Sequence, residues 1–417
     1  MPASKESDDK RLLLKVGLGF LGVVALLGVC GIGAFAYGIA EGFQRTVSRA
    51  SDPPTEPGYV LVAGSDLEAF GQQIAGQLAA SDWAAVDADM DWEALGFRTS
   101  EAMHHSGRPG LLPGAVDGAR QLGFSTVMHG GQPEGSSFSY RGIFPRDGAS
   151  RLRFRHLMQS GGFQFAELLV GVRPGAEPRV VDVWSLTTGE DLSSTMAEGL
   201  GGVAAANPDF LRRLNGERNP WDDHGQDVQR AQTLFNTGHA AEGLQLLDAL
   251  PPVMRDSRMV SLLRVRLASA GDPARYVEVL DEVAALRPND PAVLAMLVDR
   301  HALAQEWSKV ADDVRRLEED VADPYLDTYQ ARMEHLAGHA DRARALVDAA
   351  VLAEPDLLDA HDVRMVVALG QGDTVVADQE LQVLRRQFQI DLERLATMEG
   401  YDAIRTLPSF PATSPLR

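Results

Sequence analysis

The sequence predicts a multi-domain protein with an N-terminal transmembrane helix, a small α+β domain in which a curved antiparallel sheet lies over helices, and a C-terminal all-α solenoid. Three observations predict this fold class. Residues 12–40 form an apolar run with a single charge, Lys15. Within residues 59–190 the apolar positions change from a helical period to strict alternation. Within residues 222–410 a pattern of two helices and a turn recurs at about 34 residues.

The composition limits the classes of protein that this chain can belong to. It has 417 residues and a formal net charge of −20. That length exceeds what one hydrophobic core usually serves, so more than one domain is expected. The negative charge would repel phosphates, so we expect no nucleic-acid partner. Cys30 is the only cysteine, which excludes an intramolecular disulfide. Arginine greatly outnumbers lysine, a usage associated with GC-rich bacterial genomes.

The apolar run 12–40 is long enough to span a bilayer core, which takes about 20 apolar residues. Four basic residues lie in the tail 1–11 or at the start of the run, so the positive-inside rule places the tail in the cytoplasm. The prediction is a single-pass signal-anchor in the lipid bilayer of a bacterial inner membrane, with the soluble domains extracytoplasmic. Two alternatives remain open: a cleaved signal peptide ending at Ala34–Ala36, and a lipoprotein signal around Cys30.

Small residues recur at the end of the apolar run. Ala34, Gly38 and Gly42 stand four residues apart, a spacing that lets two membrane helices approach closely. The run therefore also offers a route to a homo-oligomer. A Pro-rich juxtamembrane linker, 41–58, follows, and its prolines predict a semi-rigid spacer.

The α+β domain, 59–190, begins with helical periodicity. Leu67, Phe70 and Ile74 recur at three- and four-residue spacing, and Ser81-Asp82 is expected to provide the N-cap of a second helix. Alternating apolar residues then predict four strands, at 137–145, 150–159, 162–172 and 178–187. Asp-Gly and Gly-Gly pairs between these segments favour antiparallel hairpins, so a sheet packed on helices is expected.

This domain resembles the nuclear transport factor 2-like superfamily. The resemblance is carried by Ala80–Trp83 in the opening helices and by Val181–Trp184 in the last strand. It implies a cone in which a curved sheet wraps over helices. The superfamily includes isomerases, dehydratases and many non-catalytic modules, so the fold alone does not select a function.

Strand alternation singles out three polar residues in this domain. If the predicted strands turn one common face into the cone, His156, Glu167 and Asp182 point inward together. A histidine beside a carboxylate in an apolar pocket is typical of general acid–base catalysis, so this trio is the candidate catalytic pocket. Hydrogen-bonded core residues are the alternative interpretation. The sequence predicts no metal site and no cofactor.

The tail, 222–410, divides into five helix–turn–helix segments. Their turns are expected at Gly238, Gly271, Glu306, Gly338 and Gly372. Small residues follow five positions later at Gly243, Ala311, Ala343 and Ala377, with Tyr276 as the exception. Bulky apolar residues follow nine positions later at Leu247, Leu280, Val347 and Leu381, with Arg315 as the exception. Small residues let adjacent helices approach, and bulky ones fill the space between helix pairs.

This pattern resembles the tetratricopeptide repeat family. The resemblance implies a solenoid of stacked helix pairs, whose concave groove binds peptides or protein segments. The closing residues, 391–410, are expected to form a terminal cap. Residues 191–221 are expected to form a helical connector between the α+β domain and the repeats.

The sequence therefore predicts a membrane-anchored scaffold or adaptor that binds a protein partner through the concave face of the solenoid. The alternative is a small-molecule-binding protein or an acid–base enzyme, isomerase-like or dehydratase-like, that uses the pocket of the α+β domain. The interior of that domain discriminates between the two. An open, partly polar cavity around His156 would favour the enzyme, and a filled apolar core would favour the scaffold.

Overall fold

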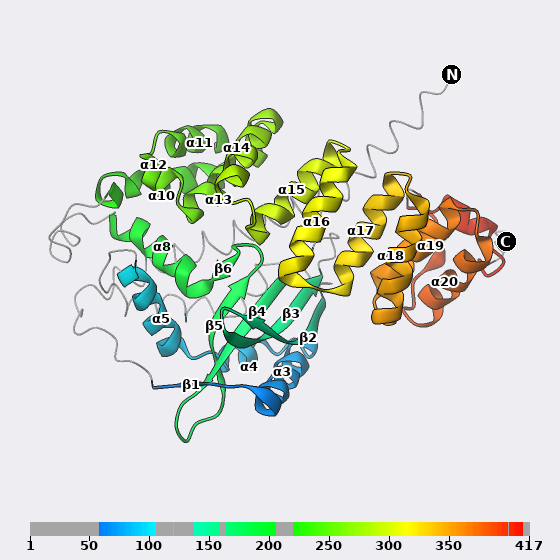
Figure 1. The fold of residues 1–417 in the computed structure, drawn as a ribbon, viewed down its shortest axis with the longest axis horizontal. Coiled ribbons are helices and arrows are strands. Elements are labelled where there is room, and N and C mark those ends of the chain that lie inside the picture. Colours follow the sequence, from blue (N-terminus) through cyan, green and yellow to red (C-terminus); the bar gives the residue numbers. More distant parts are fainter. Residues whose placement is uncertain are drawn as a thin grey trace. The chain divides into compact units, whose positions relative to one another are not determined.

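A computed structural model describes residues 58–105, 120, 137–157, 163–205, 220–398 and 400–411 of the chain (Figure 1). The described residues fall into two compact units that divide between Val293 and Leu294. The first unit contains the sheet and the first helical hairpins. In the described residues of the second unit all regular elements are helices. Each unit is described by itself below.

One part of the predicted fold class, the transmembrane helix, is not supported by the described residues. The apolar run 12–40 lies outside the described residues, as do the tail 1–11 and the linker up to residue 57. Within the part of the chain that the structure describes, no helix is both long enough and apolar enough to cross a bilayer. The predicted transmembrane signal-anchor, its contact with lipid and the single-pass membrane location are therefore withdrawn. What the fold class retains is an antiparallel sheet with helices and a set of helical hairpins.

The sheet of the first unit is antiparallel and has six strands. Five of them are neighbours in sequence order, namely β2 (Ser137–Arg146), β3 (Ala149–Leu157), β4 (Phe163–Val172), β5 (Arg179–Ser185) and β6 (Glu190–Asp191). The sixth, β1 (Val60–Leu61), pairs with the end of β4. The four predicted strands correspond to β2 through β5, whereas β1 and β6 are two-residue strands that alternation cannot reveal.

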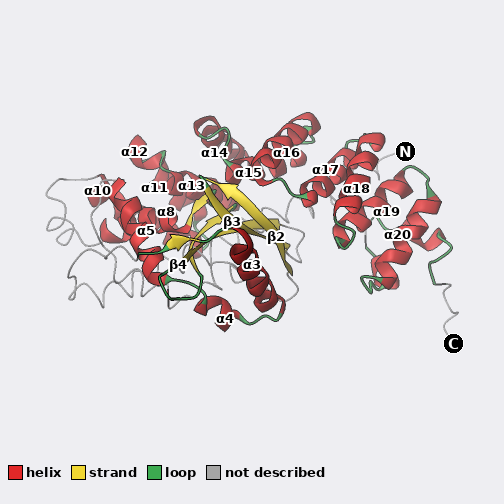
Figure 2. Cartoon of the chain, turned by 60° about the horizontal axis from the view of Figure 1, so that its bottom comes forward, coloured by secondary structure: helices red, strands yellow, loops and turns green. Residues whose placement is uncertain are grey.

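Helices pack on one face of this sheet. Three lie between β1 and β2, namely α3 (Gly64–Ala79), α4 (Trp83–Ala88) and α5 (Trp92–His105), and α8 (Leu192–Ala205) follows β6. Figure 2 shows α3 lying across β2 and β3. The apolar stripe of α3 is buried there against Leu152 and Phe154 of β3. Of the predicted pair Ser81-Asp82, Asp82 caps α4, because its carboxylate accepts the amide of Ala85 at 3.1 Å.

The predicted connector 191–221 begins with a helix that belongs to the α+β layer. Met196 and Ala197 of α8 lie in the same apolar core as α3 and the sheet. On its other side α8 packs against α10 (Pro220–Asn236), the first helix of the hairpins. The first hairpins are therefore joined to the sheet by direct helix packing.

The remaining helices of the first unit are α11 (Ala240–Asp248), α12 (Pro252–Arg255), α13 (Arg258–Gly271) and α14 (Pro273–Leu286). Gly243 shows why a small residue is needed in α11. A Cβ atom added there would stand 2.4 Å from Leu267 of α13 and 2.9 Å from the carbonyl oxygen of Ala231 in α10. The predicted small position thus lies where three helices meet.

The helices of the second unit also form hairpins, each with a first and a second helix. They are α16 (Trp307–Val321), α17 (Pro324–Leu336), α18 (Ala340–Ala353), α19 (Leu358–Gly370), α20 (Thr374–Arg386), α21 (Leu392–Leu395) and η3 (Asp402–Thr406), while α15 (Pro291–Leu303) spans the division between the units. Ile404, Leu407 and Phe410 pack against Leu381 and Leu384 of α20. The closing residues thereby cover the apolar face of the last hairpin, as expected of a cap.

One predicted turn is displaced by one residue. In three hairpins a glycine with positive φ precedes the first residue of the second helix by two positions: Gly238, Gly338 and Gly372 have φ of 83°, 80° and 74°. In the third hairpin that position belongs to Gln305, with φ of 58°, and not to Glu306. Five and nine residues after Gln305 stand Val310 and Val314, both buried. The bulky position that the sequence pattern assigned to Arg315 is therefore occupied by Val314. The prediction was displaced because this turn contains no glycine to mark where it begins.

The turn glycines give a first testable prediction. Gly238 has φ of 83° and open space around its missing Cβ, so Gly238→Ala should cost roughly 1–2 kcal/mol through backbone strain alone. Gly271 ends the corresponding helix of the next hairpin without a positive φ. Gly271→Ala should therefore leave stability unchanged or raise it by about 0.4–1 kcal/mol. Urea unfolding of the two variants checks this, and equal losses would contradict the conformation assigned to Gly238.

Candidate functional site

The structure separates the three predicted pocket residues. His156 lies on the face of β3 that is turned into the apolar core, beside Phe154. Its ring stacks on that of Phe138 with 4.1 Å between centroids and 5° between planes, and the residue is 3% exposed. Trp83 of α4 meets Phe138 edge-on. His156 is therefore packed among aromatic rings of the core, away from either carboxylate.

Glu167 points to the opposite face of the sheet. In the register of β3 and β4 its cross-strand neighbour is Arg153, whereas His156 is opposite Gln164. Arg153 Nη2 donates to Glu167 Oε1 at 2.6 Å, and Arg146 Nε donates to Glu167 Oε2 at 2.6 Å. The Glu167 side chain is fully buried. Its two oxygens are thus each held by a guanidinium group.

Asp182 lies on the same face as Glu167 but in a separate cluster. Its carboxylate accepts Arg98 Nε at 2.7 Å and Ser193 Oγ at 2.6 Å. The backbone amides of Val183 and Ser193 also donate to it, at 2.9 and 3.2 Å. Burial and the nearby charge of Asp191 raise the pKa of Asp182, and the bonds from Arg98 and Ser193 act against that rise.

The expectation that these three side chains point inward together was therefore wrong, for a definable reason. Alternation within a strand tells which residues share a face, but it does not tell which face of one strand matches which face of the next. That match depends on the cross-strand register, and the register places Arg153 opposite Glu167. The face carrying Arg151, Arg153 and Arg155 is the one that Glu167 and Asp182 share.

We call this side of the sheet the arginine face; it comprises Arg151, Arg153 and Arg155 of β3, Phe165 and Glu167 of β4, and Asp182 and Trp184 of β5. All of these residues are buried. Two guanidinium groups, one from this face and one from β2, stack on aromatic rings. Arg146 lies over Trp184 and Arg153 lies over Phe144, each 3.7 Å from the ring centroid. Stacking and ion pairing together fix both arginines on Glu167.

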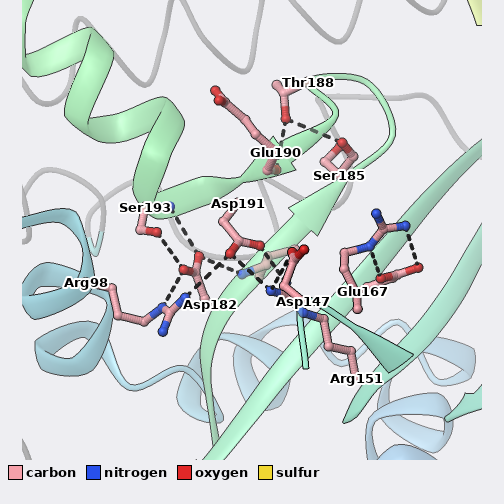
Figure 3. Close-up of polar contacts among 12 residues, drawn as sticks. Arg98, Asp147, Arg151, Glu167, Asp182, Ser185, Thr188, Glu190, Asp191 and Ser193 are labelled. Carbon is pink, nitrogen blue, oxygen red and sulfur yellow. Dashed lines mark hydrogen bonds and ion pairs between the residues drawn. The ribbon is translucent and has the colours of Figure 1, made fainter. Parts of the chain in front are cut away.

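Four residues of these clusters were not singled out from the sequence: Arg98, Arg146, Asp191 and Ser193. Asp191 accepts Arg151 Nη1 at 2.5 Å and Nη2 at 3.1 Å, and Arg98 Nη2 at 3.5 Å (Figure 3). The alternating arginines of β3 were the available signal, because buried arginines require carboxylates nearby. In this arrangement the carboxylates of Glu167 and Asp182 accept hydrogen bonds from arginine. Neither of these two carboxylates faces His156, as acid–base catalysis by the trio would require.

The helical hairpins contain a recurring arginine bridge. Arg264 Nε of α13 donates to Asp248 at 2.8 Å, and its Nη2 donates to Glu282 of α14 at 2.8 Å. In the second unit Arg364 Nε of α19 donates to Asp348 of α18 at 2.6 Å, and its Nη1 donates to Glu380 of α20 at 2.8 Å. In both cases the arginine follows the aspartate by 16 residues. Each bridge joins the second helix of one hairpin to both helices of the next.

A second set of polar contacts links the first helices of the hairpins in the second unit. Tyr329 of α17 donates to Asp299 of α15 at 3.1 Å. Asp362 of α19 pairs with Arg332 of α17 at 3.4 Å and accepts Tyr401 at 2.7 Å. Burial raises the pKa of Asp299 well above its usual range, against the effect of the Tyr329 hydroxyl. We call these five residues the polar ladder.

No protein-family model, curated protein or solved structure matches this chain. The resemblances to the nuclear transport factor 2-like superfamily and to the tetratricopeptide repeats remain predictions. Function has to be argued from the residues themselves.

Proposed function

We propose that this protein is a scaffold or adaptor that binds a protein partner through its helical hairpins. The observation that carries the proposal is the arginine bridge, which recurs with one spacing at Arg264 and at Arg364. A repeated contact between successive hairpins favours regular stacking, and stacked hairpins present the side chains of their first helices along one continuous surface. Such surfaces are typical of proteins that bind extended polypeptide segments.

The charge of the chain supports a basic partner segment. The formal net charge is −20, and the first helices of the second unit carry Asp327, Asp359 and Asp362 at half-buried positions. Arg332 is the cation placed among them, paired with Asp362. An acidic surface speeds and orients the approach of a basic segment, and it disfavours acidic competitors.

The α+β domain has a supporting role in this proposal. His156 is packed among aromatic rings, and Glu167 and Asp182 each accept hydrogen bonds from arginine. The hypothesis of an acid–base enzyme therefore lacks the pocket on which it was based. The direct packing of α8 on α10 makes this domain a base for the first hairpins.

A charge-reversal pair tests the proposal. Asp359 lies half-buried on the first helix α19, and Asp341 is exposed on the second helix α18. Asp359→Lys and Asp341→Lys change the net charge equally. We expect Asp359→Lys to lower recovery of a partner by about tenfold or more, because it reverses the charge on the binding surface. Asp341→Lys should stay within about twofold of the unmodified chain.

The measurement is chemical crosslinking of the full-length chain in an extract of its own cells, with the crosslinked peptides identified by mass spectrometry. The proposal expects crosslinks on α15, α17 and α19, and selective loss in Asp359→Lys. Crosslinks confined to the sheet, or equal losses in the two variants, would contradict it.

A further inference from the structure

The turn between β5 and β6 meets the start of α13 at one arginine. Arg258, the first residue of α13, donates from Nε to the carbonyl oxygen of Thr188. Its Nε also lies 3.7 Å from Glu190 Oε2, and its Nη1 pairs with Asp290. The turn belongs to the sheet and Arg258 to the hairpins. This contact therefore joins the two parts of the first unit independently of the packing of α8 on α10.

Gly189 shows how closely the turn approaches Arg258. Its φ is 64°, and a Cβ atom added there would stand 2.1 Å from Arg258 Nη2 and 2.9 Å from Asp290 Oδ1. Any side chain at this position would push the guanidinium group away. The turn is thus built to let Arg258 reach both Thr188 and Glu190.

Three carboxylates converge on this junction. Glu198 of α8 accepts the backbone amide of Met259 at 2.8 Å, at the N-terminus of α13. Glu190 accepts the hydroxyl of Thr195 at 2.8 Å, and its side chain is 19% exposed. Asp290 is 6% exposed at its side chain and also accepts the amide of Ala292. Arg258 is the cation that pairs with Glu190 and Asp290.

The three carboxylates around one arginine affect the pKa of Glu190. Burial is the largest effect, and with the charges of Glu198 and Asp290 it raises the pKa of Glu190 to about 7. Thr195 and Arg258 act in the opposite direction. The adjacent Asp191 is held by Arg151 and does not share this arginine.

We propose that Gly189, Glu190, Glu198, Arg258 and Asp290 form a pH-sensitive latch, which holds the start of α13 to the sheet when Glu190 carries a proton and loosens when Glu190 ionises. With Glu190 neutral, Arg258 pairs with Asp290 and donates to the Thr188 carbonyl oxygen. With Glu190 ionised, Arg258 is the cation for two carboxylates, Glu190 and Asp290, and a third carboxylate, Glu198, lies nearby in the same part-buried site. The contacts of the latch lie outside the packing of α10 on α8, so we expect loosening to be local to the turn and the first turn of α13.

The direction of the pH effect follows from linkage. The closed latch binds the Glu190 proton more tightly than an open one, in which glutamate has its ordinary pKa of 4.5. Closure is therefore most favourable below that ordinary value. It weakens as the pH rises through about 7, the pKa in the closed form.

Hydrogen exchange on the full-length chain tests the latch. The amides of Met259 and of residues 187–198 are followed near pH 6 and near pH 8, after correction for the intrinsic exchange rate. We expect their protection to fall by up to about tenfold between the two, because closure weakens between the ordinary pKa of 4.5 and the closed-form pKa of about 7 and changes little above it. Glu190→Gln should keep the protection at both pH values, because its neutral amide mimics the protonated side chain.

Two further variants make the outcome decisive. Glu177→Gln removes the same charge from an exposed turn of the same sheet and should follow the unmodified chain. Glu198→Gln removes a charge that raises the pKa of Glu190, so the loss of protection should be complete at a lower pH and smaller in total. An unchanged pH response in both Glu190→Gln and Glu198→Gln would overturn the latch, and so would equal protection at the two pH values in the unmodified chain.

Discussion

Replacing Glu167 with alanine should destabilise the protein by about 3–5 kcal/mol, the usual cost of breaking a buried ion pair. The carboxylate is fully buried and is shared by Arg146 and Arg153, whose side chains are 13% and 3% exposed. Without it, two guanidinium groups lose the acceptor that offsets their burial. Their stacking on Trp184 and Phe144 is too weak to replace it. Urea unfolding of the full-length chain gives the free energy directly.

Two control variants separate the charge from the hydrogen bonds. Glu167→Gln keeps an acceptor oxygen and should lose less stability than Glu167→Ala. Glu177→Ala removes an exposed glutamate from the turn before β5 and should leave the unfolding curve nearly unchanged. If Glu167→Ala and Glu177→Ala behaved alike, the arginine face would not be a buried ion cluster. Glu167 would then again be open to a catalytic interpretation.

Replacing Val314 with alanine should cost about 2–3 kcal/mol, from lost apolar burial and the cavity that remains. Val314 is fully buried in α16, whereas the neighbouring Arg315 has a side chain that is 58% exposed. The sequence pattern assigned the packed position of this hairpin to Arg315. The positive φ of Gln305 moves the assignment to Val314.

Arg315→Ala is the matched control for this prediction. Arg315 pairs with Glu319 at 2.8 Å on the surface of α16, an (i, i+4) contact worth a few tenths of a kcal/mol. Its removal should therefore barely shift the urea midpoint. The opposite ranking of the two variants would show that the turn begins at Glu306, as the sequence pattern had it.

The sequence determined the elements that depend on local chemistry. Alternation located β2 through β5, and the Asp82 side chain marked the start of α4 through a hydrogen bond three residues along the chain. Gly238, Gly338 and Gly372 marked three turns because each has a positive φ that glycine adopts without strain. These features are decided within a few residues, so one segment of sequence is enough to predict them.

The tertiary structure decided everything that depends on how elements pair. His156 and Glu167 alternate correctly within their own strands, yet the register of β3 and β4 places them on opposite faces. The partner of Glu190 is Arg258, 68 residues along the chain, and no spacing rule connects them. Periodicity fixes the faces of one element. Which faces meet is set by the packing of distant segments, and the acceptors of buried arginines are known only once those segments have been placed together.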